Sequence, residues 1–531
     1  MDGPRLQSPG GGYPGMMRRI PRTARAAELP PGAVRLGTPA GRRVLLATVL
    51  GSGMAFLDGT VVNIALPHIG RDLGAGVEAL QWTVNAYTLT LAGLLLLGGA
   101  LGDRAGRRRV FVAGVLWFTV ASVACAAAPT AEVLIAARAL QGVGAALLTP
   151  GSLAILEAVF HPDDRGAAIG AWSGLGGAAA ALGPFAGGWL IDAVSWRAIF
   201  LINVPLAIVV VWTSVRHVPE TRDASAEGGL DLAGAALAAS GLAGVVLGLT
   251  RATGSGWTDR LVLGSLAAGT LALAAFLVTQ ARVRNPMLPL GLFRDRRFSA
   301  ANAVTLLVYA ALGGGLFLLP VQLQVVLGYS ALGTGMALLP LTAVMLVLSA
   351  RVGRIAQRIG PRLPMTAGSA LAAAGMWLMV RIDGDARYAA DVLPAVLVLA
   401  LGLSLVVAPL TATVMSAAGP RAGVASAINN DVARIASLLA VAVLPIAAGL
   451  GGGDLADPAA LGEGFRTGVL ICALLCAGGA VVSALAISGG PRPAAVARTH
   501  CPVDGPPLAG RRPPPAEIPP GAATLGGRAH T

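Results

Sequence analysis

Long apolar runs separated by short polar segments recur along most of the chain. A bilayer core about 30 Å thick needs about 20 apolar residues in helical conformation to cross it. The runs that approach this length predict fourteen transmembrane helices, at residues 44–66, 82–101, 110–128, 132–152, 166–190, 198–215, 231–250, 261–280, 298–319, 334–350, 364–380, 391–415, 423–449 and 466–488. The pattern therefore predicts an all-α polytopic membrane protein.

The composition also indicates that lipid is the main solvent. Hydrophobic residues make up 55% of the chain and charged residues only 12%, with a mean hydropathy of +0.73. A soluble protein of 531 residues needs far more surface charge. The net charge of +13 is compatible with nucleic-acid binding, but the placement of the basic residues argues against that function.

The arginines predict how the helices are oriented. An even number of helices puts both termini on one side of the membrane. If that side is cytoplasmic, the basic clusters at 104–109, 282–297 and 351–362 all lie inside. The outer loops then hold only seven arginines, namely Arg71, Arg197, Arg251, Arg260, Arg381, Arg387 and Arg466. Because positive charge resists translocation, we expect cytoplasmic termini in a cell membrane, with the basic face toward anionic lipid and no nucleic acid bound.

The two ends of the chain predict little structure. Residues 1–43 form a basic tail that we expect to be disordered, in which Met16 and Met17 are alternative starts. Residues 489–531 form a Pro-rich tail of the same kind. The four cysteines and five histidines have neither disulfide nor metal-ligand spacing, so we expect no metal and no cofactor.

The turn after the second predicted helix has the sequence GALGDRAGRRR, at residues 99–109. Its central glycine gives the backbone the freedom that a tight turn needs. Its aspartate and arginines can form a charge network, or cap a neighbouring helix, in one conformation and release it in another. A basic loop that only fixes topology is the alternative, but the residue order is too detailed for that. The predicted gating residues here are Gly99, Asp103, Arg104, Gly106 and Arg107.

Glycines and a proline interrupt the fifth predicted helix. Gly183 and Pro184 break the backbone hydrogen-bond ladder at membrane depth, which is tolerated only where neighbours or a cavity satisfy the freed groups. Gly187 and Gly188 allow helices to approach closely and slide. We therefore predict a bendable, gating helix, with a merely kinked and tightly packed helix as the alternative.

Four ionisable side chains fall within predicted membrane spans, namely Asp58, Arg138, Asp431 and Arg434. A charge in hydrocarbon is costly, so each should face a partner or a watery cavity. Burial and a nearby arginine act in opposite directions on the proton affinity of a carboxyl group, so this affinity can switch between conformations. Asp431 and Arg434 are three apart on one helix face and can simply neutralise each other. Alternatively, they provide a second proton site or a contact for a cationic substrate.

Together with the turn at 99–109, three further motifs resemble the major facilitator superfamily. RALQGVG at 138–144 resembles its motif B, and GPFAGG at 183–188 resembles motif C of its exporting antiporters, with Ala179 in place of a further glycine. LDGTVVNIALP at 57–67 resembles the first-helix motif of the fourteen-helix drug:proton antiporters of the EmrB/QacA type. The resemblance covers roughly residues 44–488.

The resemblance implies the major facilitator fold with two extra central helices. The six-helix bundles would span 44–215 and 298–488, with the extra pair within 216–297. It also implies that Asp58 couples protons to transport, with Arg138 as its fixed positive partner. Since one chain supplies both bundles, we expect a monomer.

The predicted function is export of small amphipathic, often cationic, drugs or antibiotics in exchange for protons. A facilitator or proton symporter of the same fold that imports a solute is the alternative. An enzyme is not expected, because the sequence contains no nucleotide loop, metal cluster or nucleophile constellation. The side chains expected to line a substrate cavity are Asn63, Tyr87, Gln141, Phe200, Tyr309, Asn429 and Asn430.

Overall fold

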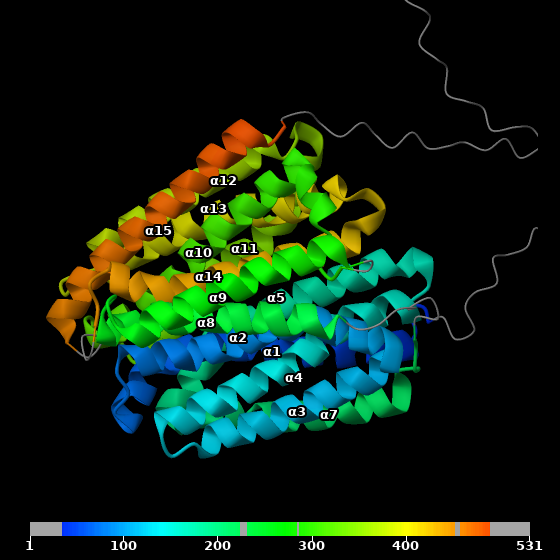
Figure 1. The fold of residues 1–531 in the computed structure, drawn as a ribbon, viewed down its shortest axis with the longest axis horizontal. Coiled ribbons are helices and arrows are strands. Elements are labelled where there is room, and N and C mark those ends of the chain that lie inside the picture. Colours follow the sequence, from blue (N-terminus) through cyan, green and yellow to red (C-terminus); the bar gives the residue numbers. More distant parts are fainter. Residues whose placement is uncertain (1–33, 223–230, 284–285, 452–456, 489–531) are drawn as a thin grey trace, which may run out of the picture.

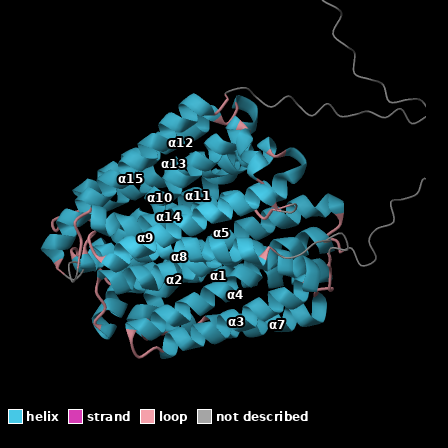
Figure 2. Cartoon of the chain, in the orientation of Figure 1, coloured by secondary structure: helices cyan, strands magenta, loops and turns pink. Residues whose placement is uncertain are grey.

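A computed structural model describes residues 34–222, 231–283, 286–451 and 457–488 of the chain. Within this part the regular structure is helical, apart from one isolated bridge between Val34 and Phe160 (Figure 2). The long helices are α1 (Pro39–Leu73), α2 (Val77–Ala105), α3 (Arg107–Ala127), α4 (Ala131–Val159), α5 (Pro162–Ala193), α7 (Asn203–His217), α8 (Leu232–Ser255), α9 (Arg260–Arg282), α10 (Arg296–Val325), α11 (Ala331–Ile359), α12 (Arg362–Leu378), α13 (Leu393–Ala417), α14 (Ala422–Ala447) and α15 (Pro458–Ala486). The short α6 (Ala198–Leu201) continues into α7 as one span. Fourteen helices of the described residues are long and apolar enough to cross a membrane, which confirms the prediction.

The helices form two lobes with an extra pair at the seam (Figure 1). Helices α1 to α7 pack on one another in the first lobe, and α10 to α15 do so in the second. Helix α8 contacts α2 of the first lobe and α14 of the second, whereas α9 packs mainly on α8. This is the expected fold class of two six-helix bundles with two additional helices.

Several helices extend beyond the apolar runs that predicted them. The short predictions at 334–350 and 364–380 correspond to α11 (Ala331–Ile359) and to a span from Arg362 to Arg381. Hydropathy detects only the part of a helix inside the hydrocarbon, while the backbone hydrogen bonds continue into the headgroup region. Capping then sets the end: the Ser330 hydroxyl accepts the backbone N–H of Gly333 at the start of α11, at 3.0 Å.

The prediction of a disordered tail up to residue 43 is wrong for its last part. Thr38 caps α1, with its hydroxyl accepting the Gly41 N–H at 3.1 Å, and Pro39 occupies the first helical turn. Before the helix, the Val34 N–H donates to the carbonyl of Val159 at 2.9 Å. Local capping and this pairing fix residues 34–43. Residues 1–33 and 489–531, which hold the rest of the predicted tails, lie outside the described residues.

The helical bundle has two ends, the tail side and the far end. The tail side is the end at which α1 begins and α15 ends, and the far end is the one at which Gly74 turns the chain from α1 into α2. Gly74 adopts the left-handed conformation, with φ of 61°, that closes a helix at such a turn.

Candidate functional site

A buried ion pair lies at the centre of the first lobe, as expected for two of the membrane-depth charges. Arg138 of α4 donates from Nη1 to Oδ2 of Asp58 of α1 at 2.5 Å. Gln141, one turn along α4, donates from Nε2 to Oδ1 of the same carboxylate at 2.8 Å. Both charged side chains are only 1% exposed. The carboxylate is therefore held on both oxygens and shielded from solvent.

A second layer of polar groups holds this pair in place. Arg138 donates from Nε to the backbone carbonyl of Thr83 of α2 at 3.0 Å. The Ser122 hydroxyl of α3 accepts both Gln141 Nε2, at 2.8 Å, and Asn203 Nδ2 of α7, at 3.3 Å. Five helices thus contribute to one network around Asp58. Such a network is worth most when every member is satisfied.

Aromatic rings cover the guanidinium. The Cζ atom of Arg138 lies 4.4 Å from the ring centroid of Tyr87 and 5.8 Å from that of Phe200. The Tyr87 hydroxyl in turn donates to the carbonyl of Ala55 at 3.2 Å. These contacts stabilise a cation that has lost its water.

Three residues expected in a substrate cavity, Tyr87, Gln141 and Phe200, therefore contact the ion pair in this conformation. Their role in substrate binding stays a prediction. Sequence reasoning had no signal for Thr83, which acts through its backbone, or for Ser122. Asn203 begins α7, and its contact with Ser122 depends on the packing of α3 against α7.

The second pair of membrane-depth charges is arranged differently. Asp431 of α14 is 9% exposed, and its Oδ1 is buried without a hydrogen-bond partner in the described part of the protein. The ion pairs of the described residues do not include one between Asp431 and Arg434. The two residues share a helix face without a direct ion pair, but the charge of Arg434 acts on the Asp431 carboxyl group, so mutual neutralisation stays an alternative.

The other expected cavity residues lie on α1, α10 and α14. Asn429 donates from Nδ2 to the Thr305 hydroxyl at 2.6 Å and so joins α14 to α10. Asn430 is exposed and donates to the Ser426 carbonyl of its own helix at 3.1 Å. The carbonyl of Tyr309 accepts the hydroxyl of Ser437 at 3.2 Å. Asn63 has a buried Oδ1 with no hydrogen-bond partner among the described residues, and it and the others stay candidates for substrate contact.

The basic turn on the tail side forms a charge network within the first lobe. Arg107 donates from Nε to Asp103 at 2.8 Å, and Gly106 adopts φ of 113°, which other residues rarely reach. Glu220, which follows α7, accepts the Arg108 N–H at 3.1 Å and lies 3.7 Å from Arg109 Nε. Glu220 was not foreseen, since nothing in its sequence context marks it. The gating role of the turn stays a prediction.

Helix α5 runs through Gly183 and Pro184 without ending. The proline has no N–H to give to the carbonyl of Ala180 one turn earlier. The Thr60 hydroxyl of α1 donates to the carbonyl of Leu57 at 2.9 Å and also lies within 3.4 Å of the Ala180 carbonyl. A Cβ added at Gly183 would lie 2.4 Å from that hydroxyl, and one at Gly187 would lie 2.5 Å from Val61. The two glycines thus let α5 lie directly against α1.

Gly188 instead brings α5 against the opposite lobe. A Cβ there would lie 2.4 Å from the carbonyl oxygen of Ala331 of α11, and one at Gly335 would lie 2.2 Å from that of Pro184. The Asp192 carboxylate accepts the N–H groups of Ala331, at 3.2 Å, and Leu332, at 2.9 Å. It thereby caps the N-terminus of α11 from the other lobe.

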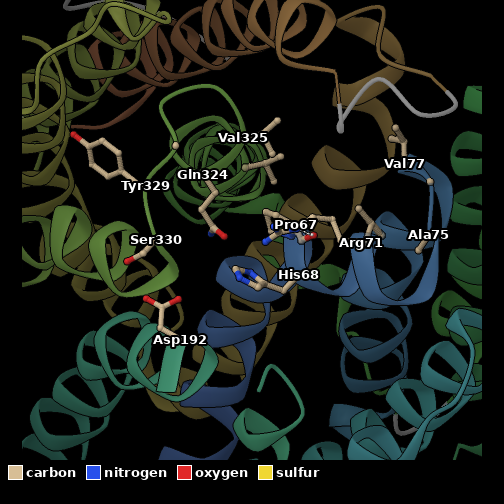
Figure 3. Close-up of a pocket in the computed structure, with 15 residues that line it drawn as sticks. Pro67, His68, Arg71, Ala75, Val77, Asp192, Gln324, Val325, Tyr329 and Ser330 are labelled. Carbon is tan, nitrogen blue, oxygen red and sulfur yellow. Dashed lines mark hydrogen bonds between the residues drawn. The ribbon is translucent and has the colours of Figure 1, made fainter. Parts of the chain in front are cut away.

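Two further hydrogen bonds join the lobes at the far end. Gln81 of α2 donates to the carbonyl of Val441 of α14 at 2.8 Å, and Gln324 of α10 donates to that of Ile64 of α1 at 2.9 Å. We call these contacts the far-end seam, formed by Gln81, Pro184, Gly188, Asp192, Gln324 and Gly335. A cavity of about 600 Å³ lies at this end between α1, α2, α5 and α10, where His68, Asp192 and Gln324 face one another (Figure 3).

The same face of α5 is open toward the tail side. Three further glycines lie on the same face of α5 as Gly188, because their separations from it are close to whole numbers of helical turns. They are Gly170, Gly174 and Gly177. Apart from the adjacent backbone of α5 itself, no described heavy atom lies within 4 Å of a Cβ position at any of the three. The lobes are thus joined at the far end, whereas this face of α5 is open at these three positions toward the tail side.

Two helical lobes closed at one end, with a buried ion pair in one of them, form the arrangement expected of a membrane transporter. A family model described as Major Facilitator Superfamily matches residues 48–441. The chain belongs to this superfamily.

Curated relatives and solved structures agree with this assignment. The chain is 37% identical over 403 residues to the tetracenomycin C resistance and export protein of Streptomyces glaucescens, covering 76% of this chain and 75% of the relative. It is 37% identical over 452 residues to a puromycin resistance protein of Streptomyces alboniger, covering 83% of this chain and 89% of that relative. A bacterial homolog of the human lysosomal transporter Spinster, solved in an inward-facing and unoccupied conformation, has a TM-score of 0.59 at 17% identity, covering 85% of this chain and 97% of that chain. The structural likeness concerns the fold alone.

Proposed function

We propose that this protein exports small amphipathic antibiotics or drugs from the cell in exchange for protons. The relatives' names support export of such compounds. The observation that carries the proposal of proton exchange is the buried pair of Asp58 and Arg138, which is too enclosed to serve as a surface contact.

The coupling step uses the balance of charge in this pair. In the conformation described here, Asp58 accepts hydrogen bonds from Arg138 and Gln141, as an ionised carboxylate would. A proton on Asp58 would leave the guanidinium buried without an opposite charge, which costs several kcal/mol. Protonation therefore favours a conformation in which Arg138 gains another partner or water. Substrate binding and proton release can then alternate across the cycle.

The orientation follows from the arginines of the described segments. The basic turns at 104–109 and 351–362 lie on the tail side, which we assign to the cytoplasm of a cell membrane. The far-end seam is then the closed outer gate, and the open tail side faces the cytoplasm, from which an exporter collects its substrate. Because one chain provides both lobes, the proposed working unit is a monomer.

The test is uptake of radiolabelled puromycin and of ethidium into inverted membrane vesicles, with and without an imposed acid-inside gradient. We expect gradient-dependent uptake by the parent and its loss in Asp58→Asn. Asp72→Asn is the matched control, because Asp72 lies on the same helix but is 47% exposed and pairs with Arg197 at the far end.

Two results would contradict the proposal. Uptake that does not depend on the gradient would indicate a facilitator, and accumulation in the opposite direction would indicate import. Unchanged coupling in Asp58→Asn, with normal amounts of protein in the membrane, would exclude Asp58 as the proton carrier.

A further inference from the structure

A second, smaller cavity lies where the extra helix pair meets both lobes. It has a volume of about 150 Å³, and its walls come from α2, α8, α9 and α14. Leu96, Ala238, Leu242, Phe276 and Ile435 make most of its lining apolar, and Asp431 supplies a carboxylate. It is separate from the Asp58 network, none of whose residues lines it.

We infer that this cavity is a subsite for an organic ammonium group, with Asp431 as its counter-charge. The inference rests on the proposed function, since it names the class of substrate that such a transporter would accept. It also gives a role to the α8–α9 pair, which the two six-helix bundles do not require.

The first argument is the state of Asp431. Its side chain is more than nine-tenths buried, and Oδ1 has no hydrogen-bond partner among the described residues. Arg434 does not line the cavity and makes no ion pair with Asp431 among the described residues, although its charge acts on both Asp431 and Tyr87 from outside the cavity. A buried carboxylate in apolar surroundings needs an opposite charge or a proton. An ammonium group in the cavity provides that charge.

The second argument is size. A cavity of about 150 Å³ accommodates a group as large as benzene, whereas pockets for whole drugs are about 300 to 1,000 Å³. The cavity therefore fits the trimethylammonium or aryl-ammonium end of a molecule, and the rest of the molecule would lie outside it. The small alanine and glycine residues of its lining leave space for such a group, and the leucine, isoleucine and phenylalanine side chains would contact its carbon atoms.

The third argument is that a polar chain fixes the walls. Asp231 accepts the Gly234 N–H at 2.8 Å and Gln280 Nε2 at 2.6 Å. The oxygen of Gln280 accepts the Leu288 N–H at 3.0 Å. These bonds tie the start of α8 and the end of α9 to the segment that carries Met287 and Leu288, which also line the cavity. A pre-formed wall lowers the cost of ordering a bound ligand.

The test is calorimetric binding to the purified full-length protein in detergent. The probes are phenyltrimethylammonium chloride and the similarly sized, uncharged 2-phenyl-2-propanol, at constant ionic strength. We expect Asp431→Asn to weaken binding of the cation about tenfold or more and to leave binding of the alcohol within about twofold. Ala238→Phe fills the cavity and should weaken both, while Ala236→Phe, at an exposed position of the same helix, should weaken neither.

The outcomes separate this site from the proposed function. Equal affinity of the cation for the parent and for Asp431→Asn would overturn the site, even if puromycin uptake remains gradient-dependent. The site would also be overturned if Ala238→Phe bound both probes with the affinity of the parent. If Asp431→Asn lowers cation affinity but the parent shows no gradient-dependent uptake, the site stands and proton-driven export is wrong. Unchanged cation binding with loss of proton coupling would make Asp431 a proton site instead.

Discussion

The contact between α5 and α11 at Gly188 allows a quantitative test of how the far end closes. In Gly188→Ala, the new Cβ would lie 2.4 Å from the carbonyl oxygen of Ala331, 2.7 Å from its carbon and 2.8 Å from Cα of Leu332. All three are backbone atoms, so none can rotate away. We expect the substitution to act as a wedge in the far-end seam.

The size of the effect follows from these distances. Ordinary contact begins at 3.4 Å, so the helices must separate by 3.4 − 2.4, or about 1 Å. Overpacking of this kind costs about 1 to 3 kcal/mol. The cost applies only while the far end is closed, so the closed population should fall about 5- to 150-fold relative to the open one.

The assay is pulsed electron paramagnetic resonance between spin labels at Val194 and Met336, in a background without native cysteines. Both positions are exposed, at 70% and 53%, and they lie toward the far-end parts of α5 and α11. We expect a longer-distance population in Gly188→Ala. Gly177→Ala is the matched control, since it gains the same helix propensity on the same face, but its Cβ would meet no described atom outside the adjacent backbone of α5 within 4 Å. Identical distance distributions for the two variants would refute the wedge argument.

Two further predictions concern the first lobe. Arg138→Met leaves the Asp58 carboxylate buried without its cation, and should lower the free energy of unfolding by about 3 to 5 kcal/mol. Thermal unfolding in detergent measures this, and the double variant with Asp58→Asn should be more stable than the single one; equal stability would contradict the assigned pair. Thr60→Val removes a hydroxyl that lies within hydrogen-bond distance of the carbonyls of Leu57, at 2.9 Å, and Ala180, at 3.4 Å, and should cost about 1 kcal/mol by the same assay. No loss would mean that other groups satisfy these carbonyls.

Local chemistry made much of this protein predictable. The length and apolarity of each segment decide whether it can cross a bilayer, so the fourteen spans could be read from the sequence. The same applies to the candidate residues Asp58, Arg138 and Gly188, because a charge at membrane depth is costly, and a glycine run allows close helix approach, wherever the helix lies. Helix ends were less predictable, as α11 shows, because hydropathy does not report on capping outside the hydrocarbon.

Tertiary structure alone decided which of these residues meet. Gln141 and Asp58 are 83 positions apart, and Asp192 and Ala331 are 139 apart, so no helical periodicity relates them. Which apolar helices become neighbours depends on how closely their small-residue faces fit, and this fit is a property of pairs of helices rather than of segments. For the same reason the sequence identified Asp431 as a charge at membrane depth, but only the packing of α8 and α9 against α2 and α14 placed it in a cavity.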